Sequence, residues 1–200
     1  MPGDCMKDIS LKNQLRLKIL DKRERISMSD RGSYSSSIFS LLDSVDEYKN
    51  ADTILFYVNY RSEVITKPYI EKALSDGKRI YCPRVEGLDI SFFRIDKMSD
   101  LSSGYQGIFE PGKDELKRYT GNMQNAKTVV IVPGSVFDRS GNRMGYGKGF
   151  YDRFLKRYAK LIKIAVCYDM QIMDEEIPHN ENDVKMNIIV SERQVIRING

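Results

Sequence analysis

The sequence predicts an α/β fold, in which one three-layer α/β/α domain, residues 1–200, surrounds a partly parallel central sheet. Three apolar runs, at 52–58, 128–132 and 161–168, have the length and composition of buried strands. Segments with apolar residues at helical spacing separate these runs, which is the order typical of α/β proteins. Two hundred residues suffice for one sizeable core and are few for two, so we expect a single domain.

The first predicted helix covers residues 7–25, where an apolar residue recurs every four positions from Leu11. Lys12 and Arg16 also lie four positions apart, and therefore project side by side along one edge of this helix. Two such cations are consistent with a solvated face or with a binding surface. Their spacing alone leaves both interpretations open.

A second helix is predicted from the capping side chains at 27–30 to about residue 48. The strand at 52–58 is apolar at both odd and even positions, which is typical of a strand covered on both faces. Residues 59–63 should then leave the sheet at its carboxyl edge, where open α/β sheets hold their ligands. Glu63 is the only carboxylate in this segment. A loop glutamate is commonly just solvated, but this one lies where sites form.

The other predicted elements are one helix and several strands. Thr66 can cap a helix that ends at Asp76-Gly77. Residues 96–121 are rich in glycine and are expected to form loops. The remaining predicted strands cover residues 79–83, 89–95, 187–190 and 194–198.

The composition excludes several classes of protein. A hydrophobic share of 41% and a charged share of 30% are ordinary for a soluble protein. No apolar run approaches the roughly 20 residues of a membrane span, and the first residues lack the order of a signal peptide, so we expect a cytoplasmic location. The three cysteines are far apart, which favours free thiols, and the single histidine excludes a His-rich metal site. A net charge of +4 suits a polyanionic small molecule and is too weak alone to indicate nucleic acid.

The most informative stretch is 132–155, where an apolar strand, a glycine-dense loop with cations and a helix start follow one another. Several glycines in one turn allow positive φ and let backbone N–H groups approach an anion. A helix beginning at Gly149 would add free N–H groups and a partial positive charge. Between positions 138 and 157, six cations outnumber two carboxylates, so this segment carries as much net charge as the whole chain. We therefore predict an anion pocket, with phosphate as the anion.

Asp152 falls in the first turn of that helix, where the helix dipole alone would stabilise a carboxylate. Beside a bound polyphosphate it would instead repel the ligand unless a cation lay between them, and Mg²⁺ bridges carboxylates and phosphates in this way. Both interpretations stay open. Two generic phosphate motifs do not fit: Asn142 and Gly149 break the Walker pattern, and Phe150 breaks the dinucleotide pattern.

Residues 133–155 resemble the signature of the 5-formyltetrahydrofolate cyclo-ligase family, in the order Pro-Gly-Ser-Val-Phe-Asp-Arg-Ser-Gly-Asn-Arg-Met-Gly-Tyr-Gly-Lys-Gly-Phe-Tyr-Asp-Arg-Phe-Leu. The resemblance extends over nearly the full chain. Shorter similarities occur in the expected order at Lys12-Asn13-Gln14-Leu15-Arg16, Ser62-Glu63-Val64-Ile65-Thr66, Cys82-Pro83-Arg84-Val85, Glu110-Pro111, Gln171, Pro178 and Asn182-Asp183.

The resemblance implies a NagB/RpiA/CoA-transferase-like fold and a ligase that depends on ATP and Mg²⁺. Its substrates would be 5-formyltetrahydrofolate and ATP, and its products 5,10-methenyltetrahydrofolate, ADP and phosphate. The γ-phosphoryl group would first activate the formyl oxygen, and N10 of the folate would then attack the carbon and expel phosphate. Such a transfer needs charge neutralisation and alignment more than a covalent nucleophile. We expect a monomer that acts on these small molecules, without nucleic acid or membrane partners.

The resemblance also implies residue roles. ATP would be held by Lys12, Arg16, Arg143, Met144, Gly145, Tyr146, Gly147, Lys148, Gly149, Phe150 and Tyr151. The folate would lie against Val58, Glu63, Tyr146, Gly147, Lys148, Gly149 and Phe150. Mg²⁺ would be bound by Asp152 and Asp183, and the catalytic residues would be Lys148 and Arg143.

Three positions depart from the family pattern or vary within it: Phe150 replaces a common tyrosine, Asn187 replaces a common aspartate, and Tyr146 occupies a variable position. One alternative is a non-catalytic paralogue that binds folate or nucleotide, although the polar site residues are intact. Another alternative is an RNA-binding accessory domain that uses the basic loop and its tyrosines.

Overall fold

The computed structural model describes residues 2–121 and 127–198, the first nine of them as backbone only. Its main sheet has the strand order β12-β11-β9-β6-β1-β2-β3. The five inner strands run parallel, whereas β3 and β12 pair antiparallel to their neighbours at the two edges. The strands are β1 (Thr53–Leu55), β2 (Arg79–Glu86), β3 (Asp89–Ile95), β6 (Thr128–Val132), β9 (Ile162–Val166), β11 (Ile188–Val190) and β12 (Val195–Arg197). The predicted α/β class with a partly parallel sheet is confirmed.

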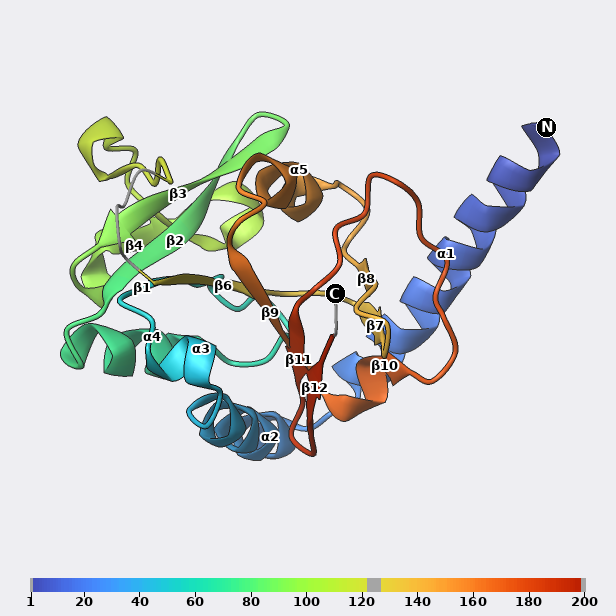
Figure 1. Ribbon diagram of the computed structural model, residues 1–200, viewed down its shortest axis with the longest axis horizontal. Coiled ribbons are helices and arrows are strands. Elements are labelled where there is room, and N and C mark those ends of the chain that lie inside the picture. The colour runs from blue at the N-terminus through green and yellow to red at the C-terminus, as the bar shows by residue number, and fades with distance from the viewer. Residues whose placement is uncertain (1, 122–126, 199–200) are drawn as a thin grey trace.

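Helices cover both faces of this sheet and make three layers (Figure 1). Helices α2, α3 and α4 lie on one face and α5 lies on the other, while α1 packs beside the sheet and its amino-terminal half extends away from the body. The helices are α1 (Pro2–Glu24), α2 (Met28–Leu42), α3 (Asp46–Lys49), α4 (Lys67–Ser75) and α5 (Phe150–Arg157). In the part of the chain that the structure describes, no helix combines the length and the apolar character of a membrane span.

The core is divided by the sheet, because alternate strand residues face opposite sides. Ile54 of β1 packs in the cluster beneath α2 and α4, and the adjacent Leu55 packs in the cluster beneath α5. In β6, Val129 and Ile131 join the first cluster, and Val130 joins the second. The apolar pattern of these strands, without alternation, is therefore explained by burial on both faces.

Smaller sheets flank the main one. Strands β7 (Val136–Asp138), β8 (Arg143–Met144) and β10 (Ile172–Met173) form a three-stranded sheet, and β4 (Leu101–Ser103) pairs with β5 (Phe109–Pro111). A third apolar cluster of Ile19, Val136, Met144 and Ile177 packs α1 against the three-stranded sheet. The sequence did not predict these short strands, because two or three residues carry too little periodicity to read.

Several predicted boundaries were wrong. The second helix does not run to residue 48: it ends at Leu42, where the Ser44 hydroxyl donates to the Leu41 carbonyl at 2.6 Å, and α3 starts separately at Asp46. The first strand is shorter than 52–58. Strand β2 extends past residue 83, because its pairing with β3 continues to the end of the hairpin.

Thr66 precedes α4 as predicted, but its side chain does not cap the helix. Its hydroxyl instead donates to the Tyr57 carbonyl at 2.9 Å and so ties the start of α4 to the segment that follows β1.

Candidate active site

The glycine segment begins at the carboxyl end of β6 and is more ordered than a glycine-dense loop. Between Ser135 and Met144 it forms the β7–β8 hairpin, whose turn is organised by the buried carboxylate of Asp138. Asp138 accepts hydrogen bonds from the backbone N–H of Ser140 at 2.9 Å and of Asn142 at 3.0 Å, and from the Asn142 side chain at 2.7 Å. The expectation that a glycine-dense loop directly follows the strand was therefore wrong for residues 135–144, and the loop proper covers 145–149.

The loop at 145–149 passes directly over a guanidinium. A Cβ atom on Gly145 would lie 2.9 Å from the Nη1 atom of Arg143, so a larger residue there would displace this side chain. The loop ends at Gly149, which precedes the first residue of α5 in a left-handed conformation. The predicted order of strand, glycine loop and helix start is therefore present, with the hairpin inserted before the loop.

Helix α1 supplies cations to this loop from a distant part of the sequence. The Nε atom of Arg16 donates to the Gly145 carbonyl at 2.8 Å. Lys12, one turn earlier, forms an ion pair with Asp183 at 2.9 Å. Residues predicted to share one nucleotide site are thus brought together from the first helix, the glycine loop and the carboxyl-terminal segment.

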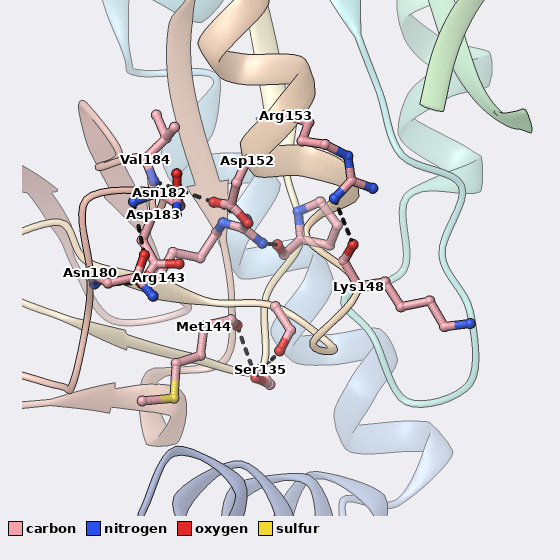
Figure 2. Close-up of polar contacts among 12 residues, drawn as sticks. Ser135, Arg143, Met144, Lys148, Asp152, Arg153, Asn180, Asn182, Asp183 and Val184 are labelled. Atoms are coloured by element: carbon pink, nitrogen blue, oxygen red, sulfur yellow. Dashed lines mark hydrogen bonds and ion pairs between the residues drawn. The ribbon is translucent and has the colours of Figure 1, made fainter. Parts of the chain in front are cut away.

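Arg143 lies beneath the loop rather than on its surface. Its Nη1 atom donates to the Pro133 carbonyl at 3.2 Å, and its Nη2 atom forms an ion pair with Asp152 at 2.9 Å (Figure 2). The guanidinium also lies 5.7 Å from the centre of the Tyr151 ring. Because both partners of this ion pair are largely buried, loss of either would leave the other poorly compensated.

Asp152 and Asp183 each have one oxygen that could take a metal ion. The Oδ1 atom of Asp152 accepts from Arg143 and from the Val184 N–H, and the Oδ2 atom of Asp183 accepts from Lys12 and the Asn180 N–H. Within the described residues, no hydrogen bond reaches the other oxygen of either carboxylate. Asp152 contacts the residue that follows Asp183, so both aspartates lie in one region (Figure 2).

The predicted Mg²⁺ would have to be held by these two carboxylates without a third protein ligand of the same kind. Residues 2–121 and 127–198 contain no group of three His, Cys, Asp or Glu side chains able to hold a metal ion. Mg²⁺ is typically held by one or two carboxylates together with substrate phosphates and water, rather than by a complete protein cage. Two carboxylates with an available oxygen beside a basic loop fit that mode of binding.

Lys148 does not join the other predicted site residues. Its side chain points away from Arg143 and Asp152 (Figure 2), and its ammonium donates to the Tyr105 hydroxyl at 2.7 Å. Among the residues that the structure describes, Lys148 forms no ion pair with a carboxylate. Phe150, at the start of α5, meets the same Tyr105 ring edge-on at 6.5 Å. The predicted catalytic role of Lys148 therefore stays a prediction.

Most other cations of the segment are neutralised by partners outside it. Arg139 pairs with Asp174 at 2.7 Å, and Arg153 with Asp89 at 2.8 Å. Lys156 donates to the Asn182 side chain at 2.8 Å, a partner without charge that does not offset the charge of this lysine. The carboxylate partners of Arg139 and Arg153 offset part of the net positive charge that was counted along this segment.

Glu63 follows β1 in the chain and is only 6% exposed. It accepts hydrogen bonds from the Tyr60 N–H and from the Tyr146 hydroxyl, both at 2.8 Å. Burial raises the pKa of this carboxyl above its usual value, and the positive charge of Arg23 opposes that rise. Val58 is the other predicted folate contact outside the loop. It lies between β1 and Glu63 in the sequence, and its side chain is buried.

Two positions at the candidate site were missed or undervalued in the sequence. Arg23 of α1 is 2% exposed and donates to the Tyr146 hydroxyl at 2.6 Å. Gln171 donates to the carbonyls of Gly134 at 2.9 Å and Ser135 at 3.0 Å, which fixes the turn that follows β6. The spacing of seven residues from Arg16 could have indicated that Arg23 lies on the same face of the helix.

Met144 and Tyr151, both predicted to contact ATP, have side chains directed into the protein. The Met144 side chain packs in the cluster between α1 and the three-stranded sheet, and its carbonyl accepts from Ser135. Tyr151 packs at the edge of the core, and burial raises the pKa of its hydroxyl well above the usual value.

The chain is similar to known proteins over nearly its whole length. The sequence pattern of the 5-formyltetrahydrofolate cyclo-ligase family matches residues 8–192. The probable 5-formyltetrahydrofolate cyclo-ligase of Schizosaccharomyces pombe is 28% identical, and the match covers 93% of this chain and 97% of that protein. The 5-formyltetrahydrofolate cyclo-ligase of Mus musculus is 26% identical, with 92% of this chain and 94% of that protein covered.

Solved structures show the same fold. The NMR structure of Aquifex aeolicus 5,10-methenyltetrahydrofolate synthetase is 35% identical with a TM-score of 0.82, and covers 95% of this chain and 94% of its own. A 5,10-methenyltetrahydrofolate synthetase from Mycoplasma pneumoniae is 23% identical with a TM-score of 0.69, over 90% of this chain and 98% of its own, and supports the fold alone. Because the family pattern spans almost the entire sequence, this chain belongs to the 5-formyltetrahydrofolate cyclo-ligase family and is an enzyme of that class.

Proposed function

We propose that this protein converts 5-formyltetrahydrofolate into 5,10-methenyltetrahydrofolate, and that it uses ATP with Mg²⁺ to do so. The conversion follows from the family and from the names of its relatives. The observation that supports the use of ATP is the meeting of α1 with the glycine loop. Arg16 holds the Gly145 carbonyl at 2.8 Å and Lys12 holds Asp183 at 2.9 Å, so cations, loop and carboxylates surround one region.

The nucleotide half of this proposal rests on charge and alignment. Transfer of the γ-phosphoryl group to the formyl oxygen does not require a protein nucleophile. It requires that the negative charges are neutralised and that the reacting atoms are aligned. Lys12 and Arg16 flank the loop, and Arg143 adds a buried positive charge beneath it. The N–H groups at the start of α5 are further donors for phosphate oxygens.

Asp152 and Asp183 would hold Mg²⁺ through their available oxygens. When bound, the ion would neutralise phosphate charge during the transfer. Lys12 and Arg143 pair with these carboxylates and so hold the two side chains in place beside the loop.

The folate half of the proposal lies around Glu63. Once the formyl oxygen carries the phosphoryl group, N10 attacks the formyl carbon, the N10 proton is lost, and the carbon–oxygen bond breaks to release phosphate. Glu63 is a buried hydrogen-bond acceptor placed next to the glycine loop through Tyr146, and so offers a defined contact for a donor group of the pterin.

The proposal is tested by incubating the purified protein with ATP, Mg²⁺ and 5-formyltetrahydrofolate. We expect the near-ultraviolet absorbance of the methenyl product to rise only when all three are present, with one ADP formed per product. A second measurement separates binding from turnover: ATP with Mg²⁺ should raise the melting temperature, as any ligand that binds only the folded state does. In Lys12→Met and Arg16→Met this rise should shrink.

A folded protein with no product and no stabilisation by ATP would contradict the proposal. Stabilisation by ATP or folate without any product would instead support the non-catalytic alternative.

A further inference from the structure

Arg23 is a buried cation near the site to which the reaction described above assigns no role. It lies seven positions after Arg16, on the same face of α1, and is 2% exposed. Its guanidinium donates to three segments at once: to the Ser62 hydroxyl at 3.1 Å, to the Gly134 carbonyl at 3.2 Å and to the Tyr146 hydroxyl at 2.6 Å. It therefore joins the Glu63 loop, the end of β6 and the glycine loop to one helix.

The contact with Tyr146 continues to Glu63. Arg23 donates to the hydroxyl oxygen of Tyr146, so the hydroxyl proton is free to be donated onward, and it is directed to the Oε1 atom of Glu63 at 2.8 Å. The Tyr146 residue is 47% exposed overall, although its hydroxyl is enclosed by these two partners. Guanidinium, hydroxyl and carboxylate thus form one polarised chain, in which each bond strengthens the next.

The charge of Arg23 also acts on Glu63. Four groups face this carboxyl from the elements packed around it: Arg23 from α1, Tyr57 after β1, Tyr146 from the glycine loop and Tyr151 from α5. Burial raises the pKa values of the three tyrosines, so they stay neutral across the physiological range. Of the four, Arg23 supplies the positive charge that keeps the pKa of Glu63 from rising further.

We propose that Arg23 is a positioning residue for the folate half of the site, which acts through the Tyr146 hydroxyl to orient Glu63 and places a positive charge beside it. Because Lys12 and Arg16 project from the same helix, this contact also fixes the folate half relative to the ATP half. The inference rests on the proposed function, since it gives Glu63 a role toward the folate.

The test compares Arg23→Met, Tyr146→Phe and the double variant in steady-state turnover. We expect each single variant to lower kcat/KM for 5-formyltetrahydrofolate by about 10- to 100-fold, as loss of a hydrogen bond to a charged group does. The KM for ATP should change by no more than about twofold, because the cations facing ATP are untouched. The double variant should be no worse than the worse single variant, since both remove the same chain of contacts.

Arg31→Met is the matched control. Arg31 is another buried arginine, which donates to the backbone carbonyls of Arg23 at 3.3 Å and Glu24 at 2.7 Å and pairs with the Glu24 carboxylate at 3.6 Å. Within the described residues, no hydrogen bond or ion pair joins Arg31 to Tyr146 or to the Glu63 side chain. We expect it to lower the melting temperature while leaving kcat/KM unchanged. Tyr146→Phe removes only one hydroxyl, so it carries the test alone if Arg23→Met does not fold.

A measurement without substrate separates this inference from the proposed function. The pKa of the Glu63 carboxyl can be followed by carbon NMR of the labelled protein, with Glu63→Gln to assign the signal. We expect a higher pKa in Arg23→Met than in the natural protein, and an acid limb of the kcat/KM profile displaced to higher pH in the same direction.

Two results would overturn the inference while leaving the proposed function intact. One is a Glu63 pKa that does not change in Arg23→Met. The other is an equal loss of kcat/KM for 5-formyltetrahydrofolate and for ATP in variants that still form product. Failure of the natural protein to turn over would instead remove the proposed function. A displaced Glu63 pKa would still show the electrostatic coupling in that case.

Discussion

Asp152 shows how one side chain can serve both structure and chemistry. Its Oδ1 atom holds Arg143 at 2.9 Å and the Val184 N–H at 3.3 Å, so the residue organises the site before any ligand arrives. Its other oxygen remains for the proposed metal. The sequence left a helix-start role and a metal role open, and the structure adds a third role as counter-ion of a buried arginine.

This arrangement predicts different outcomes for two substitutions at Asp152. Asp152→Ala leaves the Arg143 guanidinium buried without its counter-ion, and should lower the free energy of unfolding by about 3 kcal/mol. Asp152→Asn keeps an oxygen for Arg143 and should cost about 1 kcal/mol. Both should reduce Mg²⁺-dependent turnover by more than the roughly 10- to 100-fold caused by loss of an outer-shell partner.

The measurements are urea unfolding and turnover across a Mg²⁺ titration. If Asp152→Asn were to keep the Mg²⁺ dependence of the natural protein, the role of Asp152 would be limited to Arg143 and the helix start.

The β7–β8 hairpin is the element that carries the glycine loop to its place. Its turn is closed by Asp138 and is packed tightly against the carboxyl-terminal segment, where the Met186 N–H donates to the Gly141 carbonyl at 2.9 Å. Gly141 has a φ of +86°, and a Cβ atom there would lie 2.9 Å from the Met186 carbonyl oxygen. The backbone of this turn therefore accepts no side chain.

Gly141→Ala should accordingly lower the free energy of unfolding by about 2 to 4 kcal/mol, from the left-handed conformation and the clash together. Gly77→Ala is the matched control, because Gly77 has a φ of +78° and open space around its Cβ position. The control should cost about 1 to 2 kcal/mol. Urea unfolding measures both free energies. Equal decreases in the two variants would mean that the backbone at Met186 shifts to accommodate the new methyl group without a loss of stability.

At the scale of the whole molecule, the order of the sheet decides which segments meet. Strands β1 and β6 are neighbours, with Thr53 opposite Thr128, so the segments that follow them emerge side by side at the carboxyl edge. One segment carries Glu63 and the other the glycine loop, and α1 spans both. Open parallel sheets place ligands at this edge for the same reason.

Global stability should also depend on charge pairs at the periphery, of which Glu86 is the clearest. Arg118 binds both its oxygens, at 2.8 and 3.2 Å, and lowers the pKa of Glu86 to about 2. A carboxyl with a lower pKa in the folded state stabilises the protein above its usual pKa, and this contribution is lost as the pH falls toward 2. Because the pair is partly exposed, solvent screening limits it to about 1 kcal/mol.

Glu86→Gln should therefore lower the free energy of unfolding at pH 7 by about 1 kcal/mol, and the gap should narrow to roughly half or less at pH 3. Urea unfolding at low salt at the two pH values measures the gap. A gap that did not change with pH would show that Glu86 stabilises the protein by packing rather than by charge.

The sequence predicts those parts of the fold that depend on residues close together along the chain. Burial on both faces gave 128–132 a continuous apolar pattern, and the helical spacing after Gly149 predicted α5 correctly, because both signals are local. The break between α2 and α3, and strands of two or three residues, depend on packing against other segments. Their sequences carry no periodicity that could reveal them.

The site divides in the same way. By itself, the sequence determined the α/β class, the anion-binding character of the glycine segment and the family resemblance, since each lies in residues close along the chain. Only the tertiary structure decided that Lys148 faces Tyr105, that Arg143 is buried against Asp152, and that Arg23 reaches Glu63 through Tyr146. These contacts join residues far apart in sequence, and whether a cation is solvated, paired or buried depends on which segments the sheet brings beside it.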